Sequence, residues 1–358
     1  MNQTQNWQMF NRLLDAGALR VQCGHWIDRV PPRGLRPWPR VEGMLLGLAI
    51  GDALGNTSEG LLPHERRARH GEVREYLLNH RAECRRVGLP SDDSQLAFWT
   101  LEQLLTDGES VPERLAARFG ASRIFGAGGT VREFLANLRE GVPWHEAGPE
   151  SAGNGALMRI APMLVPHLRR PSSALWTDTA LAAMTTHNDT ASTASCVAHV
   201  AMLWDLLAMT GAPRRGWWVD TFVSRAREIE PPAARYQTRG GRFVGWSGSL
   251  SAFVAERVPD AWRRGLSVVD ACNEWYSGAY LLETVPSALH ILMHHGDDPE
   301  EAIVRAVNDT VDNDTVGSIV GAAVGALHGV DALPPRWRAG LLGRTSEPTM
   351  GACSRSWR

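Results

Sequence analysis

The sequence of 358 residues contains no lysine, so all 37 of its basic residues are arginines. This absence excludes a Schiff-base lysine, a catalytic lysine and the lysine of a phosphate-binding loop. Cysteine is also scarce, and Cys23, Cys84, Cys196, Cys272 and Cys353 are odd in number, widely spaced and without a CxxC pair. Neither a disulfide framework nor a zinc knuckle is therefore expected.

Long apolar runs are missing as well. The longest, at about 316–327, is too short to cross a bilayer, and the first residues lack the basic and apolar regions of a signal peptide. A net charge of −2 gives no general reason to expect a surface for nucleic acid or membranes. We therefore expect a soluble protein of a reducing cytoplasm that binds neither nucleic acid nor membrane.

The chain divides into three parts by composition. Residues 1–40 form an N-terminal extension, with a short amphipathic helix around Trp7 and Phe10 and a proline-rich tether. In residues 41–330, apolar segments rich in Ala and Gly are separated by polar loops. Few of these segments alternate apolar and polar residues with a period of two, so one all-α domain is predicted. Residues 331–358 are expected to be a loosely docked C-terminal tail.

Helices are expected in this domain over 44–54, 95–106, 112–119, 177–186, 190–209, 278–294, 299–308 and 316–327. Residues 211–248 are expected to be a long connection rich in arginine and tryptophan. Gly317, Gly321 and Gly325 share one stripe of a helix, and small residues at this spacing allow two helix axes to approach closely. The pattern predicts buried inner helices.

Two acidic clusters stand at the starts of apolar helices. Asp92 and Asp93 follow Ser91, and Asp312 and Asp314 precede Thr315. Either cluster alone is explained by helix capping. Together the two clusters contain more carboxylates than helix caps require. The extra like charges repel one another, so capping alone does not explain them. Oxygen donors without paired His or Cys favour Mg²⁺, Mn²⁺ or Ca²⁺ over zinc. An EF-hand is excluded because hydrocarbon side chains occupy two of its ligand positions.

Three further segments carry polar groups that could belong to the same site. GLAIGDALGNTSEG (47–60) is a helix broken at Gly55, after which Glu59 is either a fifth carboxylate or solvated surface. SAGNGALMRIAP (151–162) is a glycine-rich turn running into a helix, which either binds a phosphate or is only a turn. His187 precedes a helix of small residues and is either structural or part of the site.

The order and spacing of these segments, together with GAYLLETVPSALHIL and AVNDTVDNDT, resemble the ADP-ribosylglycohydrolase family over about 41–329. The resemblance implies a compact all-α orthogonal helical bundle with two Mg²⁺ or Mn²⁺ ions in a central cleft. It also implies a hydrolase that removes ADP-ribose from modified protein side chains, with the N-glycosidic bond to arginine favoured over serine-linked ADP-ribose or O-acetyl-ADP-ribose.

The resemblance assigns roles to residues by position. The metal ligands would be Glu59, Ser91, Asp92, Asp93, Asp312, Asp314 and Thr315. The proton of the attacking water would pass to Asp93 or Glu59. The diphosphate or distal ribose would bind at Ser151, Gly153, Asn154 and Gly155, with His187 lining the same cleft and Tyr280 and Glu283 on the adenosine side.

This sequence departs from the family pattern at several of these positions. Ser91 and Asn313 each stand where the family usually has threonine, which are mild changes. Thr310 and Val311 occupy the place of a glycine pair. Loss of glycine restricts φ, so the change could hold the backbone away from the substrate and weaken activity.

The N-terminal extension leaves several functions open. It could pack on its own core, form a dimer or bind another protein. Immunity proteins that resemble this family reverse the modification made by an ADP-ribosylating toxin and block the toxin's active site with such an extension, so a cognate ADP-ribosyltransferase toxin is a possible partner of residues 1–40. The alternatives to a hydrolase are a stoichiometric toxin-binding module and a purely structural relative.

Overall fold

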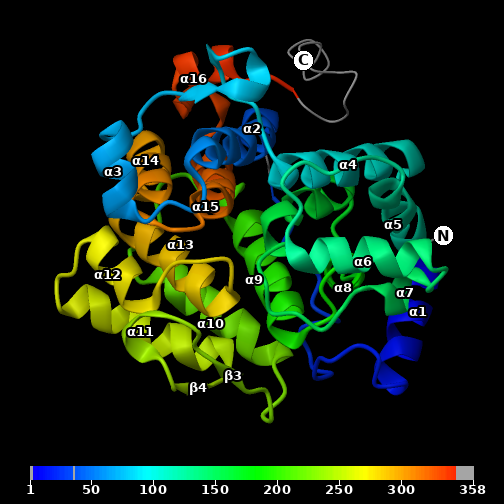
Figure 1. Ribbon diagram of the computed structural model, residues 1–358. Helices are drawn as coiled ribbons and strands as arrows, with labels where there is room; N and C mark the ends of the chain where they lie inside the picture. The colour runs from blue at the N-terminus through cyan, green and yellow to red at the C-terminus, as the bar shows by residue number, and fades with distance from the viewer. Residues whose placement is uncertain (1–2, 35–36, 344–358) are drawn as a thin grey trace.

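Two glycine-rich helices form the centre of the fold. The computed structural model describes residues 3–34 and 37–343, and in it α2 (Trp38–Gly55) and α15 (Asn313–His328) lie side by side (Figure 1). Their glycines face each other in the pairs Gly43–Gly325, Gly47–Gly321 and Gly51–Gly317, so the two helices run antiparallel. A Cβ atom on any of these six residues would come closer than 3.0 Å to the opposite backbone. The close helix approach predicted from the glycine stripe is confirmed.

The other helices surround this pair. α15 packs against α4, α9, α13 and α14 as well as α2, and its residues from Asn313 to Leu327 are all buried. A helix that is apolar on every side belongs in a core. The remaining α-helices are α1 (Gln3–Asp15), α3 (Pro63–His70), α4 (Asp92–Asp107), α5 (Pro112–Gly120), α6 (Gly129–Arg139), α7 (Trp144–Ala147), α8 (Ala174–Met184), α9 (Thr190–Leu206), α10 (Trp217–Ile229), α11 (Leu250–Arg263), α12 (Val268–Trp275), α13 (Leu281–His295), α14 (Pro299–Asp309) and α16 (Pro335–Gly340).

Few of the described residues lie in β-strands. β1 (Leu78–Asn79) pairs with β2 (Arg85–Arg86), and β3 (Tyr236–Gln237) pairs with β4 (Ser247–Gly248), both antiparallel. Short 3₁₀ helices are η1 (Asn56–Ser58), η2 (His80–Ala82), η3 (Leu157–Arg159), η4 (Ala161–His167), η5 (Gly241–Phe243) and η6 (Val330–Ala332). The predicted all-α fold is confirmed. No helix of the described segments combines the length and the apolar character of a membrane span.

Every helix expected in residues 41–330 is present, but two local predictions are wrong. The connection expected over 211–248 contains α10, whose buried Trp218, Phe222 and Ile229 recur at helical spacing. The glycine-rich turn at 153–155 leads into η3 and η4 and not into an α-helix. Pro162 and Pro166 within η4 remove backbone donors that an α-helix would use.

Both ends of the described chain pack on the body. On α1 and the segment after it, Phe10, Leu13 and Trp26 are buried in the core, and α1 lies against α8. This arrangement corresponds to the self-packing alternative for the N-terminal extension. Near the other end, Trp337 is fully buried and its indole N–H donates to the carbonyl oxygen of Arg74 at 2.8 Å.

The expected loose docking is therefore wrong for residues 331–343, because buried aromatic surface holds this part in place. The rest of that tail, with Cys353, lies outside the described residues. The boundaries 1–40, 41–330 and 331–358 remain predictions.

Candidate active site

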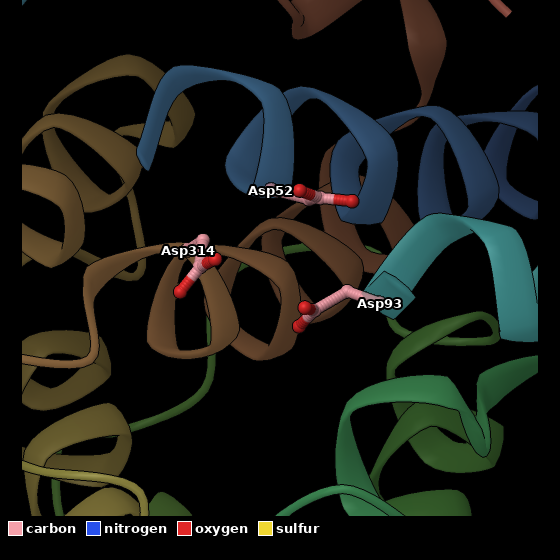
Figure 2. Close-up of side chains that lie close together, drawn as sticks. All are labelled: Asp52, Asp93 and Asp314. Carbon is pink, nitrogen blue, oxygen red and sulfur yellow. The ribbon is translucent and has the colours of Figure 1, made fainter. Parts of the chain in front are cut away.

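The central helix pair brings together acidic residues that are far apart in the sequence. Gly55 at the end of α2 lies against Asp314 at the start of α15, where a Cβ atom would be 2.5 Å from the Asp314 Cα. Figure 2 shows Asp52 from α2, Asp93 from α4 and Asp314 from α15 around one small space. One carboxylate oxygen from each lies within 4.8 Å of the others. The two sequence clusters therefore meet in the folded protein.

A second acidic group adjoins the first. Glu59, Asp312 and Asp314 each place one carboxylate oxygen within 4.8 Å of the other two. Asp314 belongs to both groups and so joins them. Two adjacent groups of oxygen donors suit a binuclear site for hard cations.

Asp52 from α2 caps the start of α4. Its carboxylate accepts hydrogen bonds from the backbone N–H groups of Ser91 and Ser94 at 2.9 and 3.0 Å, and from their hydroxyls at 2.7 and 2.6 Å. Capping of a helix by another helix was not predicted from the sequence. Because Asp52 satisfies these donors, Asp92 and Asp93 are not needed as caps. The capping alternative is therefore wrong for the first cluster.

The second cluster also contributes little capping. The α15 N-cap, Asp312, makes no capping bond through its side chain. Asp314 accepts a hydrogen bond from the N–H of its neighbour Thr315 at 2.9 Å. Asp312 instead accepts one from the side-chain amide of Asn154. Its carboxylate thus faces the glycine-rich turn and the cavity.

The carboxylates are crowded and largely withdrawn from water. Burial, followed by neighbouring carboxylates, raises the pKa of Asp92 to about 8 and that of Glu59 to about 7. The same causes raise the pKa of Asp93 and Asp314 well above the usual range, and burial raises that of Asp312. Glu59 lies at the solvent-accessible rim, so screening reduces its shift most. Close carboxylates favour proton uptake or cation binding.

These residues line a cavity of about 150 Å³. The residues proposed from the sequence that line it are Glu59, Asp92, Asp93, Gly153, Asn154, Gly155, His187, Asp312, Asp314 and Thr315. The other proposed residues, Ser91, Ser151, Tyr280 and Glu283, are not among its lining residues. Ser91 donates to Asp52, and the Ser151 hydroxyl accepts from the N–H of Gly153 at 3.2 Å.

Tyr280 supports the glycine-rich turn, and Glu283 lies one turn further along α13. Tyr280 forms an isolated antiparallel bridge with Gly153, and its ring lies 4.1 Å below the guanidinium of Arg239. Glu283 is buried, and its pKa is raised to about 7, mainly by burial. Asn154 ties the turn to the acidic cluster, because its amide donates to both Thr284 and Asp312.

The sequence reasoning missed two parts of the site. One is Asp52, which lies within the expected helix over 44–54 and was not proposed as a residue of the site. The other is the segment IFGAGGT (124–130), whose residues Gly126, Gly128, Gly129 and Thr130 line the cavity. Gly126 has φ +93, and a Cβ there would lie 2.7 Å from Asp92 Oδ1. The three glycines within residues 126–129 are the sequence feature that could have predicted a second turn whose backbone comes close to the site.

Two of the departures from the family pattern, Thr310 and Asn313, have structural explanations. Thr310 has φ −121 and ψ 160, an extended conformation that does not require glycine. Its carbonyl oxygen accepts a hydrogen bond from the buried Arg66 at 2.7 Å. The Asn313 side-chain amide donates to the carbonyl oxygen of Gly55 at 3.1 Å and joins α2 to α15. Backbone strain from the missing glycine is therefore not expected at Thr310.

The fold and the cavity together define a class of all-α proteins in which convergent carboxylates lie beside glycine-rich turns. The chain belongs to the ADP-ribosylglycohydrolase family, because the sequence model of that family matches residues 35–354. Membership in this family supports the activity of a glycohydrolase that removes ADP-ribose.

Several relatives agree with this assignment. The ADP-ribosylarginine hydrolase Tri1 of Pseudomonas putida is 28% identical over 353 residues, which cover 94% of this chain and 83% of that protein. The ADP-ribosyl-[dinitrogen reductase] glycohydrolase of Rhodospirillum rubrum is 26% identical, covering 84% and 90%. A solved structure described as an ADP-ribosylglycohydrolase-related protein complex matches with a TM-score of 0.60 and 28% identity, covering 85% and 92%.

Proposed function

We propose that this protein is a metal-dependent hydrolase that cleaves the N-glycosidic bond between ADP-ribose and arginine side chains of proteins. The observation that carries the proposal is the meeting of Asp93, Asp314 and Glu59 from separate elements in one cavity with two glycine-rich turns. The linkage is supported by the P. putida relative, which is named an ADP-ribosylarginine hydrolase.

The donor set fits two hard cations, Mg²⁺ or Mn²⁺. All donors are oxygens, and Asp93 Oδ1 is buried without a hydrogen-bond partner, so it is free to bind an ion. We assign Glu59, Asp92, Asp93, Asp312, Asp314 and Thr315 as ligands, with Ser91 next to them. Asp52 already accepts bonds from several donors and positions α4. When bound, such ions would supply binding sites for the ribose hydroxyls and would lower the pKa of a bound water.

The protein groups supply orientation and proton transfer. The backbone at Gly153 and Gly155 can approach a diphosphate closely because neither residue has a side chain. The N–H of Gly153 already donates to the Ser151 hydroxyl, so the N–H of Gly155 is the donor proposed for the diphosphate. Glu59 or Asp93 takes the proton of the attacking water as the bond from ribose to nitrogen breaks. The surrounding carboxylates stabilise positive charge that develops on the ribose ring.

Release of free ADP-ribose from a modified protein tests the proposal directly. With Mg²⁺, we expect release from arginine-linked substrate and loss of that release in Asp92→Ala. Glu102→Ala is the matched control, because Glu102 lies exposed on the same helix and pairs with Arg118. The measurement is chromatography of the released nucleotide. Release from a serine-linked substrate alone would contradict the arginine linkage, and release from neither would refute the hydrolase.

Mg²⁺ is expected to stabilise the protein more at pH 8 than at pH 5.5. The pKa of Asp92 (about 8) and of Glu59 (about 7) exceeds the unfolded value, so the metal-free folded state binds more protons than the unfolded state. The contribution of these groups to stability therefore falls as pH rises from about 4 to 8. Mg²⁺ displaces those protons and offsets the loss, by about 2.7 kcal/mol at 100-fold excess over its Kd.

Thermal melting with and without EDTA at both pH values measures this difference. Asp314→Asn should reduce the Mg²⁺ effect at pH 8 to near that at pH 5.5. A Mg²⁺ effect that is equal at both pH values in the wild type would contradict the assignment of these carboxylates as ligands.

Binding of a cognate ADP-ribosyltransferase toxin through residues 1–40, as part of an immunity function, stays a prediction. The P. putida alignment covers enough of the chain to reach into the segment before residue 35, where the family match begins. The inward face of α1 is buried, so binding would use outward residues such as Trp7, which is 38% exposed. Trp7→Ala should then abolish co-purification with the toxin and leave hydrolysis intact. Undiminished co-purification would exclude this surface.

A further inference from the structure

Arg159 is a buried cation without an acidic partner in the described part of the chain. It lies in η3, directly after the glycine-rich turn, and its side chain is fully buried. One terminal nitrogen, Nη2, donates to the carbonyl oxygen of Ala182 at 2.9 Å and to the hydroxyl of Thr186 at 2.8 Å. The guanidinium also lies 4.9 Å from the centre of the Phe119 ring. A buried charge without a counter-charge is costly, so its contacts call for an explanation.

The contact with Thr186 favours one direction for the hydrogen bond between Thr186 and His187. A guanidinium only donates, so the Thr186 oxygen accepts from Arg159 and its single proton points elsewhere. His187 Nδ1 lies within hydrogen-bond distance, 3.0 Å from the Thr186 hydroxyl. A bond in which the hydroxyl donates to Nδ1 satisfies the hydroxyl proton and leaves Nδ1 as an acceptor without a proton of its own.

The remaining ring nitrogen of His187 faces the cavity. Burial, followed by the charge of Arg159, lowers the pKa of His187 to about 3, which keeps the ring neutral. A neutral imidazole carries one N–H, and this must be on Nε2. A Cβ atom at Gly155 would be 3.0 Å from Nε2, and one at Gly153 would be 3.4 Å away. The N–H therefore sits beside the glycine-rich turn.

We propose that Arg159 and Thr186 are positioning residues that hold His187 in the Nε2–H tautomer, so that it donates a hydrogen bond to an oxygen of the ligand at the glycine-rich turn. The identity of the ligand, ADP-ribose with its diphosphate and ribose oxygens, rests on the proposed function. The tautomer of His187 does not. Arg159 follows the glycine-rich turn in the sequence, and it contacts the Thr186 hydroxyl, which in turn contacts His187. It therefore links the turn to the histidine.

A purely structural role for Arg159 makes a different prediction. Ala182 lies in the last turn of α8 and Thr186 just after the C-cap residue, and a cation is favourable there because the last carbonyl groups lack helical partners. If Arg159 only caps this helix, removal of the Thr186 hydroxyl changes stability but leaves the ring nitrogens of His187 and the affinity for ADP-ribose unchanged.

Long-range ¹⁵N spectra of the histidine rings, combined with calorimetric titration of ADP-ribose in the presence of Mg²⁺, distinguish the two roles. The test variant is Thr186→Val, which keeps the shape but lacks the hydroxyl, and its matched control is Thr186→Ser, which keeps the hydroxyl. His187→Gln identifies the His187 signals. Melting curves of Thr186→Val and Thr186→Ser establish that both are folded.

In the wild type and Thr186→Ser we expect a protonated Nε2 and a hydrogen-bonded, unprotonated Nδ1. In Thr186→Val we expect loss of the hydrogen-bonded Nδ1 signal and weaker ADP-ribose binding, by about 2- to 10-fold for the loss of one neutral hydrogen bond. A protonated Nδ1 in the wild type overturns the proposal, as does a Thr186→Val protein that matches Thr186→Ser in both measurements. Absence of ADP-ribose binding by the wild type refutes the proposed function instead, because the ring spectra need no ligand.

Discussion

Asp314→Asn is expected to abolish the release of ADP-ribose from arginine-modified protein. The substitution keeps the shape of the side chain and removes one negative charge from the residue shared by both acidic groups. Changes in the outer shell of a metal site alone cost about 10- to 100-fold in affinity or activity, so loss of this inner carboxylate should cost at least about 100-fold. The measurement is kcat/KM for nucleotide release at saturating Mg²⁺.

Asp331→Asn is the matched control for this prediction. Asp331 lies just beyond the other end of α15, with a side chain that is 91% exposed and 3.7 Å from that of Arg338. The same chemical change there should leave kcat/KM within about twofold, as expected for most exposed substitutions. Near-normal, Mg²⁺-dependent activity of Asp314→Asn would show that the acidic cluster is not the reaction centre.

Gly47→Ala is expected to lower the free energy of unfolding by about 1–3 kcal/mol or more, as overpacking of a tight core does. The added methyl group would meet the Gly321 carbonyl oxygen of the opposite helix, and the contact is with backbone, which cannot rotate away. The loss should appear although alanine is the better helix former by about 1 kcal/mol. Equilibrium denaturation followed by circular dichroism measures it.

Gly120→Ala provides the comparison in another helix. At this position in α5, the nearest atom to an added Cβ is Leu138 Cδ1 at 3.6 Å, an ordinary contact. The substitution should therefore be neutral or slightly stabilising. Equal stability of Gly47→Ala and the wild type would show that α2 and α15 can separate at no cost, and that their glycines do not set the geometry of the site.

Local patterns in the sequence were sufficient to predict those parts of the fold that depend on a single segment of the chain. The apolar runs of α2 and α15 and their glycine spacing identify buried helices, because composition and period lie within one segment. The acidic clusters could be predicted to meet because too much charge gathers at each helix start for capping alone. α10 was missed although Trp218, Phe222 and Ile229 carry a helical period, since the flanking arginines and glycines dominated the interpretation.

Other parts of the site depend on which elements pack together, and no local pattern shows that. The role of Asp52 exists only because α2 passes the first turn of α4. The contact of Arg159 with Thr186 joins η3 to the segment just after α8. The glycines of 126–129 belong to the cavity because the loop before α6 folds toward Asp92. These relationships require the three-dimensional arrangement.

The pairing of α2 with α15 also constrains how the protein can be made. One partner lies within the first 55 residues and the other begins at residue 313, so most of the chain must leave the ribosome before the two can meet. Contacts of such long sequence separation form late, because closing a large loop costs entropy. During synthesis Asp312 and Asp314 therefore remain apart from the carboxylates of α2 and α4, and repulsion between the two groups begins only when α15 packs against α2. A nascent chain stalled before residue 313 would have no assembled reaction centre.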